Sequence, residues 1–262
     1  MRLDVFLSEK GLCESRQRAK LLIESGLVMQ NGKVVKKPAA QAADTDSIEI
    51  VGEALPYVGR GALKLEKAFE TFGLDATGQT ALDVGASTGG FTEYLLLRSA
   101  AKVYAVDSGS GQLAEKLRRD ARVVSMEKCN ARLLLPKDFP VAPTFATMDV
   151  SFISQTLILP ALYAVLAEQA VLVSLVKPQF EAGREAIGKG GIVKNRADRA
   201  AAIRRVVDSA VLCGFAFCDA TPSPIPGGDG NEEFLCCFSK GGARPAYTGD
   251  VQRLIAQLTG QR

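Results

Sequence analysis

The sequence predicts an α/β protein with two parts: a small α+β domain over residues 1–50 and a doubly wound, mostly parallel, Rossmann-like sheet over residues 61–262. Two observations predict the larger part. Short apolar runs rich in β-branched residues alternate with helix-length segments, and the first run, Thr80–Val84, leads directly into a glycine-rich turn. A third observation marks off the smaller part. Met1–Lys37 holds eight basic residues against four acidic ones, so the net charge of +3 of the whole chain can be placed there.

The smaller part contains signals for two helices followed by two strands. We expect helices over residues 3–10 and 15–26 and strands over residues 27–35 and 46–52. Ser15 is a favoured N-cap residue for the second helix, and Gly26 is typical of the position just after a last turn. The dipeptide Asn31-Gly32 predicts a tight turn inside the first strand segment.

A linker with Gly and Pro, residues 51–60, precedes the larger part. The elements expected after it are helices at 63–72, 90–98, 112–119, 154–166, 197–213 and 250–262, strands at 80–84, 102–106, 123–126 and 170–178, a strand that ends at 149, an extended segment at 215–225 and a last strand at 232–240. Strands and helices that alternate at these lengths predict a sheet covered by helices on both faces.

The composition excludes several classes of site. The chain has no histidine, so it can hold neither a Ser-His-Asp triad nor a Cys/His zinc site, and we expect no metal. An enzyme with this sequence must therefore use Lys, carboxylates, Tyr or Cys for proton transfer. The cysteines show no C-x-x-C spacing and are expected to be buried small hydrophobes: Cys13, Cys129, Cys213, Cys218, Cys236 and Cys237.

Nothing in the sequence points to a membrane. The most apolar stretch, 161–176, is interrupted by Glu168 and Gln169, and no apolar run reaches the roughly 20 residues of a membrane-spanning helix. The N-terminus has no apolar core followed by a small-residue cleavage site. A cytoplasmic protein is therefore expected.

The glycine-rich turn, residues 85–90, is the strongest signal for a ligand. It follows neither the G-x-G-x-x-G pattern nor the P-loop pattern, and an acidic residue, Asp83, precedes it. A second acid, Asp107, ends the next strand, where a carboxylate can accept the hydroxyls of a ribose. Asp83 would be unfavourable beside a pyrophosphate and acceptable beside a sulfonium. The set favours S-adenosylmethionine over a dinucleotide; the alternative is a turn that only packs a helix on the sheet.

Four charged residues follow or precede predicted strands at one edge of the sheet. Asp149 and Lys177 end two strands, and the carboxyl ends of parallel strands line the ligand crevice of such sheets. Lys64 lies on the helix before the first strand, and Glu233 begins the last one. Single Lys and Glu residues are usually solvated, but two of each ordered around a cofactor turn indicate a site.

The first 32 residues resemble the S4 RNA-binding domain through the ordered string RLD..L...G...SR..A..LI..G.V..NG, which runs from Arg2 to Gly32. In that family two helices and the following turn present a basic face to structured RNA. The resemblance implies phosphate contacts at Arg2, Arg16, Lys20 and Lys37. The alternative interpretation is an ordinary solvated helix surface.

The remaining chain resembles FtsJ-like ribose 2′-O-methyltransferases and, in particular, the TlyA (hemolysin A) family, which joins an S4 domain to such a domain. The blocks that carry this resemblance are RGALKLEKAF, LDVGASTGGFT, VYAVDSGSGQL, MDVSFIS, VKPQFE and GGIVKN. Two departures stand out: Gly59 and Ala62 occupy positions where the family often has Ser and Gly. The last block has acids at both 232 and 233; spacing from Asn231 favours Glu233, with Glu232 as the alternative.

This resemblance implies a catalytic tetrad, a cofactor and an RNA substrate. The tetrad would be Lys64, Asp149, Lys177 and Glu233. The residues that would bind S-adenosylmethionine are Asp83, Gly85, Ala86, Ser87, Gly89, Gly90, Phe91, Asp107, Asn130 and Asp149. Lys128 and Arg132 flank Asn130 and could also contact RNA. The implied substrate is a cytidine of 16S rRNA, 23S rRNA or both, presented as free RNA or in a ribosomal subunit.

The chemistry assigns roles within the tetrad. A ribose 2′-hydroxyl is a weak nucleophile until its proton is removed, so we hypothesise that Lys177, as a neutral amine, takes that proton. The sulfonium and Lys64 would disfavour a second positive charge there, whereas Asp149 and Glu233 would orient the two amines. The sequence leaves three alternatives: an S4-type RNA-binding protein without catalysis, a membrane-active hemolysin, and the same enzyme class on another RNA.

Overall fold

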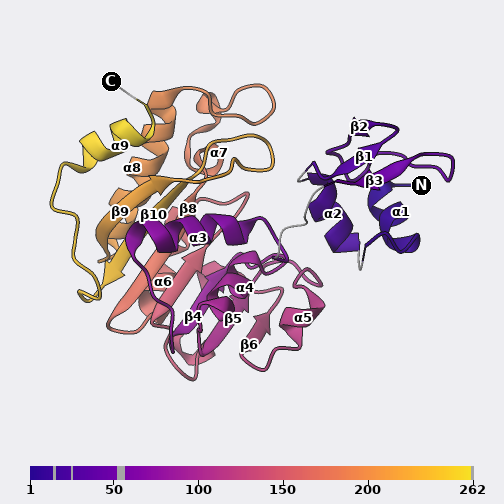
Figure 1. The fold of residues 1–262 in the computed structure, drawn as a ribbon. Helices are drawn as coiled ribbons and strands as arrows, with labels where there is room; N and C mark the ends of the chain where they lie inside the picture. The colour runs from indigo at the N-terminus through magenta and orange to yellow at the C-terminus, as the bar shows by residue number, and fades with distance from the viewer. Residues whose placement is uncertain (14–15, 25, 52–56, 261–262) are drawn as a thin grey trace. The chain divides into compact units, whose positions relative to one another are not determined.

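The computed structural model describes residues 1–13, 16–24, 26–51 and 57–260, and its contacts divide the chain into two compact units, Met1–Arg60 and Gly61–Arg262. Figure 1 shows both units. The predicted N-cap Ser15 and residues 52–56 of the predicted linker lie outside the described residues. In this part of the chain, no helix is both long enough and apolar enough to cross a membrane.

The first unit packs two helices on a small antiparallel sheet. Its elements are α1 (Leu3–Glu9), α2 (Arg16–Glu24), β1 (Val28–Gln30), β2 (Lys33–Val34) and β3 (Ile48–Ile50), with strand order β2-β1-β3. The core is small and apolar, with Leu3, Leu7 and Ile23 fully buried. Asn31 and Gly32 both have positive φ, which is the backbone of the predicted two-residue hairpin turn.

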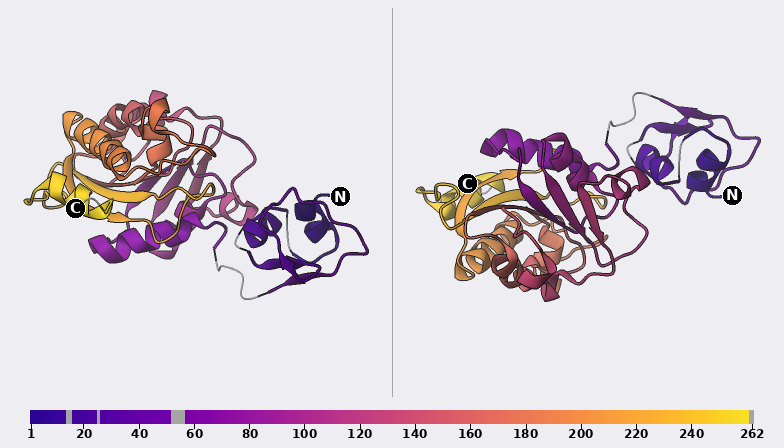
Figure 2. Two further views of the ribbon diagram at one scale, coloured as in Figure 1. Left: turned by 90° about the horizontal axis from the view of Figure 1, so that it is seen from above. Right: turned by 90° about the horizontal axis from the view of Figure 1, so that it is seen from below.

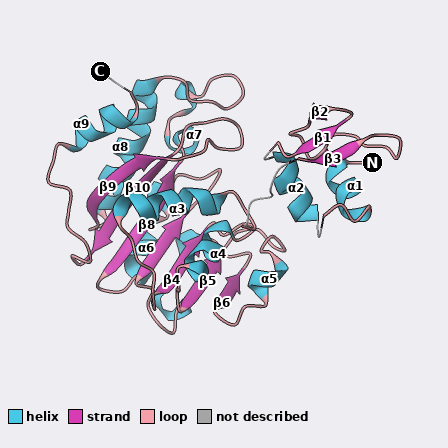
Figure 3. Cartoon of the chain, in the orientation of Figure 1, coloured by secondary structure: helices cyan, strands magenta, loops and turns pink. Residues whose placement is uncertain are grey.

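The second unit is built on a seven-stranded sheet of order β6-β5-β4-β7-β8-β10-β9. The strands, coloured magenta in Figure 3, are β4 (Thr80–Val84), β5 (Lys102–Val106), β6 (Val123–Met126), β7 (Phe145–Met148), β8 (Ala170–Val176), β9 (Ala216–Pro222) and β10 (Phe234–Lys240). Strands β4 to β8 pair in parallel, whereas β10 pairs antiparallel with both β8 and β9. The predicted fold class is confirmed, and the single reversed strand is β10.

Helices cover both faces of this sheet, as Figure 2 shows. They are α3 (Gly61–Phe72), α4 (Gly90–Leu97), α5 (Glu115–Arg118), α6 (Leu159–Val165), α7 (Pro178–Glu181), α8 (Arg196–Leu212) and α9 (Val251–Leu258). Helix α3 lies on one face, while α6 and α8 lie on the other. Helix α3 packs there because Ala62, Leu65, Phe69 and Phe72 recur at helical spacing and are all buried. The larger apolar core fills the space between the sheet and helices α6 and α8.

Three local predictions need correction. The helix expected at 112–119 is only the short α5, because Ala114 N–H donates to Thr88 O and Gln112 accepts from the Ser87 hydroxyl, which fixes this segment against the glycine turn. The helix expected at 154–166 begins as a separate 3₁₀ turn, Gln155–Leu157, before α6. Of the cysteines, only Cys236 and Cys237 are buried, and the other four are half-buried.

Candidate active site and RNA-binding face

The glycine-rich turn joins the ends of three neighbouring strands. Gly85 has φ +85°, and a Cβ at this position would lie 2.2 Å from the backbone oxygen of Asp149. Only glycine permits both that backbone conformation and that approach. The Asp149 N–H donates to Val84 O at 2.9 Å, and the Gly85 N–H donates to Val106 O at 2.8 Å. The carboxyl ends of β4, β5 and β7 are therefore held together at this turn.

A cavity of about 390 Å³ opens at these strand ends. Five of the residues predicted to bind the cofactor line it: Gly85, Ser87, Asp107, Asn130 and Asp149. Apolar side chains, among them Val106 and Ile158, form another part of the wall. The cavity thus combines a glycine backbone, two carboxylates and an apolar surface, which is typical of a small-molecule site.

Asp107 is fixed by the turn that it faces. Its carboxylate accepts the Ser87 N–H at 2.8 Å and the Gly109 N–H at 2.7 Å. Each carboxylate oxygen can accept more than one hydrogen bond, so this arrangement still leaves acceptor capacity toward the cavity.

Asp83 does not line the cavity. It is fully buried beneath the turn, where its two oxygens accept the Thr92 hydroxyl at 2.7 Å and the Thr147 hydroxyl at 2.9 Å. Burial raises the pKa of Asp83 to about 6, and the two threonine hydroxyls oppose this shift only in part. The side chain connects β4, α4 and β7, and so it supports the turn from below.

The other predicted turn residues also lie off the cavity wall and shape the turn. Gly89 has φ +98°, and a Cβ there would meet Leu117 at 2.2 Å. Its N–H donates to Ala86 O at 2.7 Å, and α4 then begins at Gly90 and the buried Phe91.

The predicted tetrad forms two ion pairs. Lys177 Nζ lies 2.6 Å from Asp149 Oδ1 and donates to the Ser151 hydroxyl at 2.9 Å. Asp149 and Ser151 line the cavity, so this pair borders it. Lys177 follows the last residue of β8 and is the N-cap of α7, whose Pro178 occupies the first turn.

The second pair joins Lys64 on α3 to Glu233, which directly precedes β10. Lys64 Nζ lies 2.5 Å from Glu233 Oε2, and the two side chains are 10% and 2% exposed. Glu232, the alternative fourth member, instead pairs with Arg199 at 2.7 Å and is 59% exposed. The structure therefore places Glu233, and not Glu232, against Lys64.

Sheet register brings the two pairs to one edge. Phe234 of β10 pairs with Val176 of β8, so the next residues outward, Glu233 and Lys177, face each other across the same two strands. Asp149 directly follows β7, the neighbour of β8. Asp149, Lys177 and Glu233 thus lie next to strand ends at one edge of the sheet. Lys64 reaches this edge from α3 through its ion pair with Glu233, 169 positions away in the sequence.

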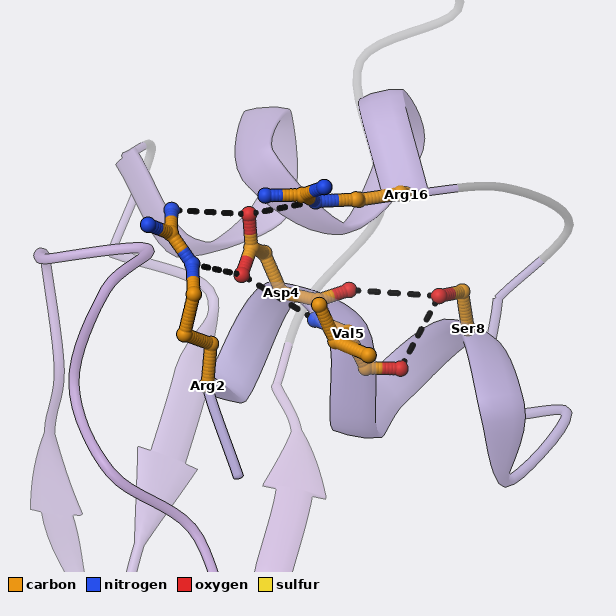
Figure 4. Close-up of polar contacts among 5 residues, drawn as sticks. All are labelled: Arg2, Asp4, Val5, Ser8 and Arg16. Carbon is orange, nitrogen blue, oxygen red and sulfur yellow. Dashed lines mark hydrogen bonds and ion pairs between the residues drawn. The ribbon is translucent and has the colours of Figure 1, made fainter.

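The predicted RNA contacts in the first unit include two arginines that share one carboxylate. Figure 4 shows Arg2 and Arg16 both bonded to the buried Asp4. Lys20 and Lys37 are exposed. In the second unit Lys128 and Arg132 are exposed beside Asn130, whose side-chain oxygen accepts the Arg132 N–H at 3.1 Å.

Sequence reasoning missed two residues of the site. Ser151 binds the Lys177 amine, and the motif MDVSFIS contained it without marking it. Phe152 lines the cavity with 92% of its surface exposed and with φ +63°, a conformation that is rare for an aromatic residue. An exposed aromatic residue cannot be recognised from its letter alone.

Comparisons with known proteins match one family to each of the two units. The FtsJ-like methyltransferase family matches residues 57–240, and the S4 domain family matches residues 1–48. The 16S/23S rRNA (cytidine-2′-O)-methyltransferase TlyA of Mycobacterium tuberculosis is 43% identical over 235 residues, which are 89% of this chain and 88% of that protein. Hemolysin A of Brachyspira hyodysenteriae is 44% identical over 239 residues, 91% of this chain and 99% of that protein. A solved structure from Streptococcus thermophilus, described as a hemolysin, has a TM-score of 0.78 and 44% identity, covering 100% of this chain and 96% of that one.

Proposed function

Because this chain belongs to the FtsJ-like methyltransferase family, in its TlyA branch that also carries an S4 domain, we propose that it methylates a ribose 2′-hydroxyl of ribosomal RNA with S-adenosylmethionine as methyl donor. The relatives named as cytidine-2′-O-methyltransferases support a cytidine target in 16S rRNA, 23S rRNA or both. The observation that carries the proposal is the lysine–carboxylate pair Lys177–Asp149 at the border of a cavity lined by a glycine turn.

The cavity wall fits the proposed cofactor. Asp107 can accept ribose hydroxyls, the Asn130 amide can bind an adenine edge, and Gly85 keeps the backbone open beside them. Asp149 contributes a carboxylate on the side that borders Lys177, where an amino or sulfonium group is favoured. The bound cofactor would supply an electrophilic methyl group on positively charged sulfur.

Lys177 has the geometry of the proton acceptor. Its amine is held by Asp149 and Ser151, and both contacts point it to the cavity border where the 2′-hydroxyl must arrive. The hydroxyl oxygen would form a bond to the methyl carbon while the carbon–sulfur bond breaks, and the hydroxyl proton would pass to the Lys177 amine after that amine has given the proton of its ion pair to solvent. Asp149 then stabilises the resulting ammonium, which is the role of an orienting partner to a general base.

Lys64 has a different role in this proposal. Its ion pair with the almost fully buried Glu233 fixes the Lys64 amine beside the start of β10. A fixed cation at that place can hold a phosphate or hydroxyl of the target nucleotide in line with the methyl group. Much of the rate acceleration would come from this positioning.

The experiment that tests the function is transfer of a labelled methyl group from S-adenosylmethionine to purified small subunits, large subunits and free tRNA. We expect label in a ribosomal subunit, at a position that alkali no longer cleaves because its 2′-oxygen is blocked. Label in tRNA alone would show that the substrate is tRNA and not ribosomal RNA. Cofactor binding without transfer to any RNA would favour an RNA-binding protein without catalysis, and dye release from liposomes would favour the membrane-active alternative.

A further inference from the structure

Asp4 in the first unit is a buried carboxylate whose hydrogen-bonding capacity is used in full. Its Oδ1 accepts the Arg2 Nε–H at 2.9 Å and the Val5 N–H at 3.1 Å. Its Oδ2 accepts the Arg2 Nη2–H at 3.1 Å and the Arg16 Nε–H at 2.9 Å. The Asp4 side chain is 0% exposed, and Figure 4 shows two guanidinium groups converging on it, that of Arg2 just before α1 and that of Arg16 at the start of α2.

The same two arginines remain accessible on their outer sides. The side chains of Arg2 and Arg16 are 44% and 52% exposed. A guanidinium carries five N–H donors, of which Arg2 gives two to Asp4 and Arg16 gives one. Within the described part of the chain, the remaining donors of both groups have no hydrogen-bond acceptor. They are therefore fixed in place and available to an anion.

The backbone beneath this cluster is also fixed. The Leu3 N–H donates to Ala40 O at 2.7 Å, and the Asp4 N–H donates to Pro38 O at 3.1 Å. Asp4 lies in the first turn of α1, where a negative charge is favourable. The guanidinium of Arg2, assisted by Arg16, lowers the pKa of Asp4 to about 2, so the carboxylate is ionised at neutral pH.

We propose that Asp4 is a positioning residue for RNA binding: it holds the guanidinium groups of Arg2 and Arg16 side by side as one donor surface for the RNA phosphate backbone. This inference rests on the proposed function. A planar guanidinium recognises phosphate through parallel N–H donors, and a fixed guanidinium loses less side-chain entropy on binding than a flexible one. The buried anion therefore favours binding of another anion by ordering the cations between them.

The direction in which Asp4→Asn changes RNA affinity distinguishes a positioning role from a simple effect of net charge. Asp4→Asn removes a negative charge and raises the net charge of the RNA-binding face by one, which by itself strengthens RNA binding. The positioning role predicts the reverse. An asparagine offers an NH₂ group where Arg2 or Arg16 needs an acceptor, so at least one guanidinium is released.

The test measures the dissociation constant of the full-length protein for ribosomal subunits at several salt concentrations. Asp4→Asn is expected to bind about tenfold more weakly than wild type, and the slope of log affinity against log salt is expected to fall by about 1 to 2. The matched control is Glu9→Gln at the exposed end of α1, which also removes one negative charge. We expect this control to bind as tightly as wild type or more tightly.

A second set of affinity measurements tests whether Asp4 affects RNA binding through Arg2 and Arg16. In a background that already carries Arg2→Ala and Arg16→Ala, Asp4→Asn should cause no further loss of affinity. At saturating RNA the methyl-transfer rate of Asp4→Asn should match that of wild type, so the effect appears in KM and not in kcat.

The outcomes are distinguishable. Equal or tighter binding by Asp4→Asn, or the same loss in the Arg2→Ala/Arg16→Ala background, would overturn the inference. If wild type itself binds no ribosomal subunit, the proposed function fails instead. If Asp4→Asn does not fold, as judged by circular dichroism, Arg16→Lys replaces it, because lysine keeps the charge and loses the planar donor set. Wild-type affinity in Arg16→Lys would equally overturn the inference.

Discussion

At the scale of single residues, the candidate site depends on carboxylates in three different environments. Asp107 accepts two backbone N–H groups, Asp149 pairs with an amine, and Asp83 is buried with only two hydroxyl donors. Burial without a cation is unfavourable for a charge, which explains why the pKa of Asp83 rises.

Asp83 yields a prediction about stability and pH. Its pKa is about 6 in the folded chain against 3.8 as the ordinary value, so its stabilising contribution is complete below pH 3.8 and is lost as pH rises through 6. Above pH 6 the ionised form costs up to roughly 3 kcal/mol. Asp83→Asn should therefore raise the free energy of unfolding at pH 8 and flatten its pH dependence between pH 4 and 6.

Chemical denaturation at closely spaced pH values measures this effect. Thr92→Val serves as control. It removes one hydroxyl that stabilises the ionised Asp83 carboxylate, so it should raise the pKa of Asp83 further and move the loss of stability to higher pH. An unchanged pH profile in Asp83→Asn would show that the buried carboxylate is not the titrating group.

At the scale of elements, the glycine turn shows how backbone geometry positions side chains far apart in the sequence. Gly85 brings the end of β4 against the backbone of Asp149, and the same contact sets where the Asp149 side chain meets Lys177. A change at Gly85 should therefore affect the cavity and the ion pair together.

Gly85→Ala should weaken cofactor binding by at least tenfold and destabilise the chain. The substitution adds a left-handed strain of about 1 kcal/mol and a contact of 2.2 Å between Cβ and Asp149 O. Gly78→Ala is the matched control, since Gly78 also has positive φ, +69°, but a Cβ there meets nothing within 4 Å. Calorimetric titration with S-adenosylmethionine measures the affinity of each variant. Equal affinities in Gly85→Ala and Gly78→Ala would show that the close approach of Gly85 to the Asp149 backbone is unimportant for cofactor binding.

The sequence predicted much of the element order, because alternating apolar runs and glycine boundaries are local signals. The turn at 85–90 was visible since it combines several glycines with a preceding β-branched strand. The helix expected at 112–119 was too long because Gln112 and Ala114, which precede α5, bond to Ser87 and Thr88, a tertiary contact that periodicity cannot report. The reversed direction of β10 depends on pairing with β8 and β9, and its apolar pattern is the same in either direction.

At the scale of the whole molecule, the proposed function assigns RNA affinity to the first unit and methyl transfer to the second. Met1–Arg60 carries the arginine pair on Asp4, while Gly61–Arg262 carries the cavity and the four charged residues at the strand ends. The residue types of this candidate site could be inferred from motifs. Their pairing could not, because whether Lys177 meets Asp149 or Glu233 depends on strand order and register, and only the folded sheet fixes these.

The same limit applies to Asp4. The ordered motif predicts RNA contacts at its neighbours Arg2 and Arg16, whereas the sequence gives the carboxylate between them no role beyond that of an ordinary acid in a first helical turn. Its function follows only from burial and from four convergent donors.

The role of Lys177 is tested most directly by the single-turnover rate of methyl transfer by Lys177→Arg, with cofactor and ribosomal subunit both saturating. Arginine keeps the positive charge and can still pair with Asp149, but it cannot accept a proton at neutral pH. We expect the rate to fall by about 10² to 10⁴ while the affinities for S-adenosylmethionine and for the subunit stay within about threefold of wild type. A Lys177→Arg enzyme that transfers methyl groups at close to the wild-type rate would contradict the assignment of Lys177 as the proton acceptor.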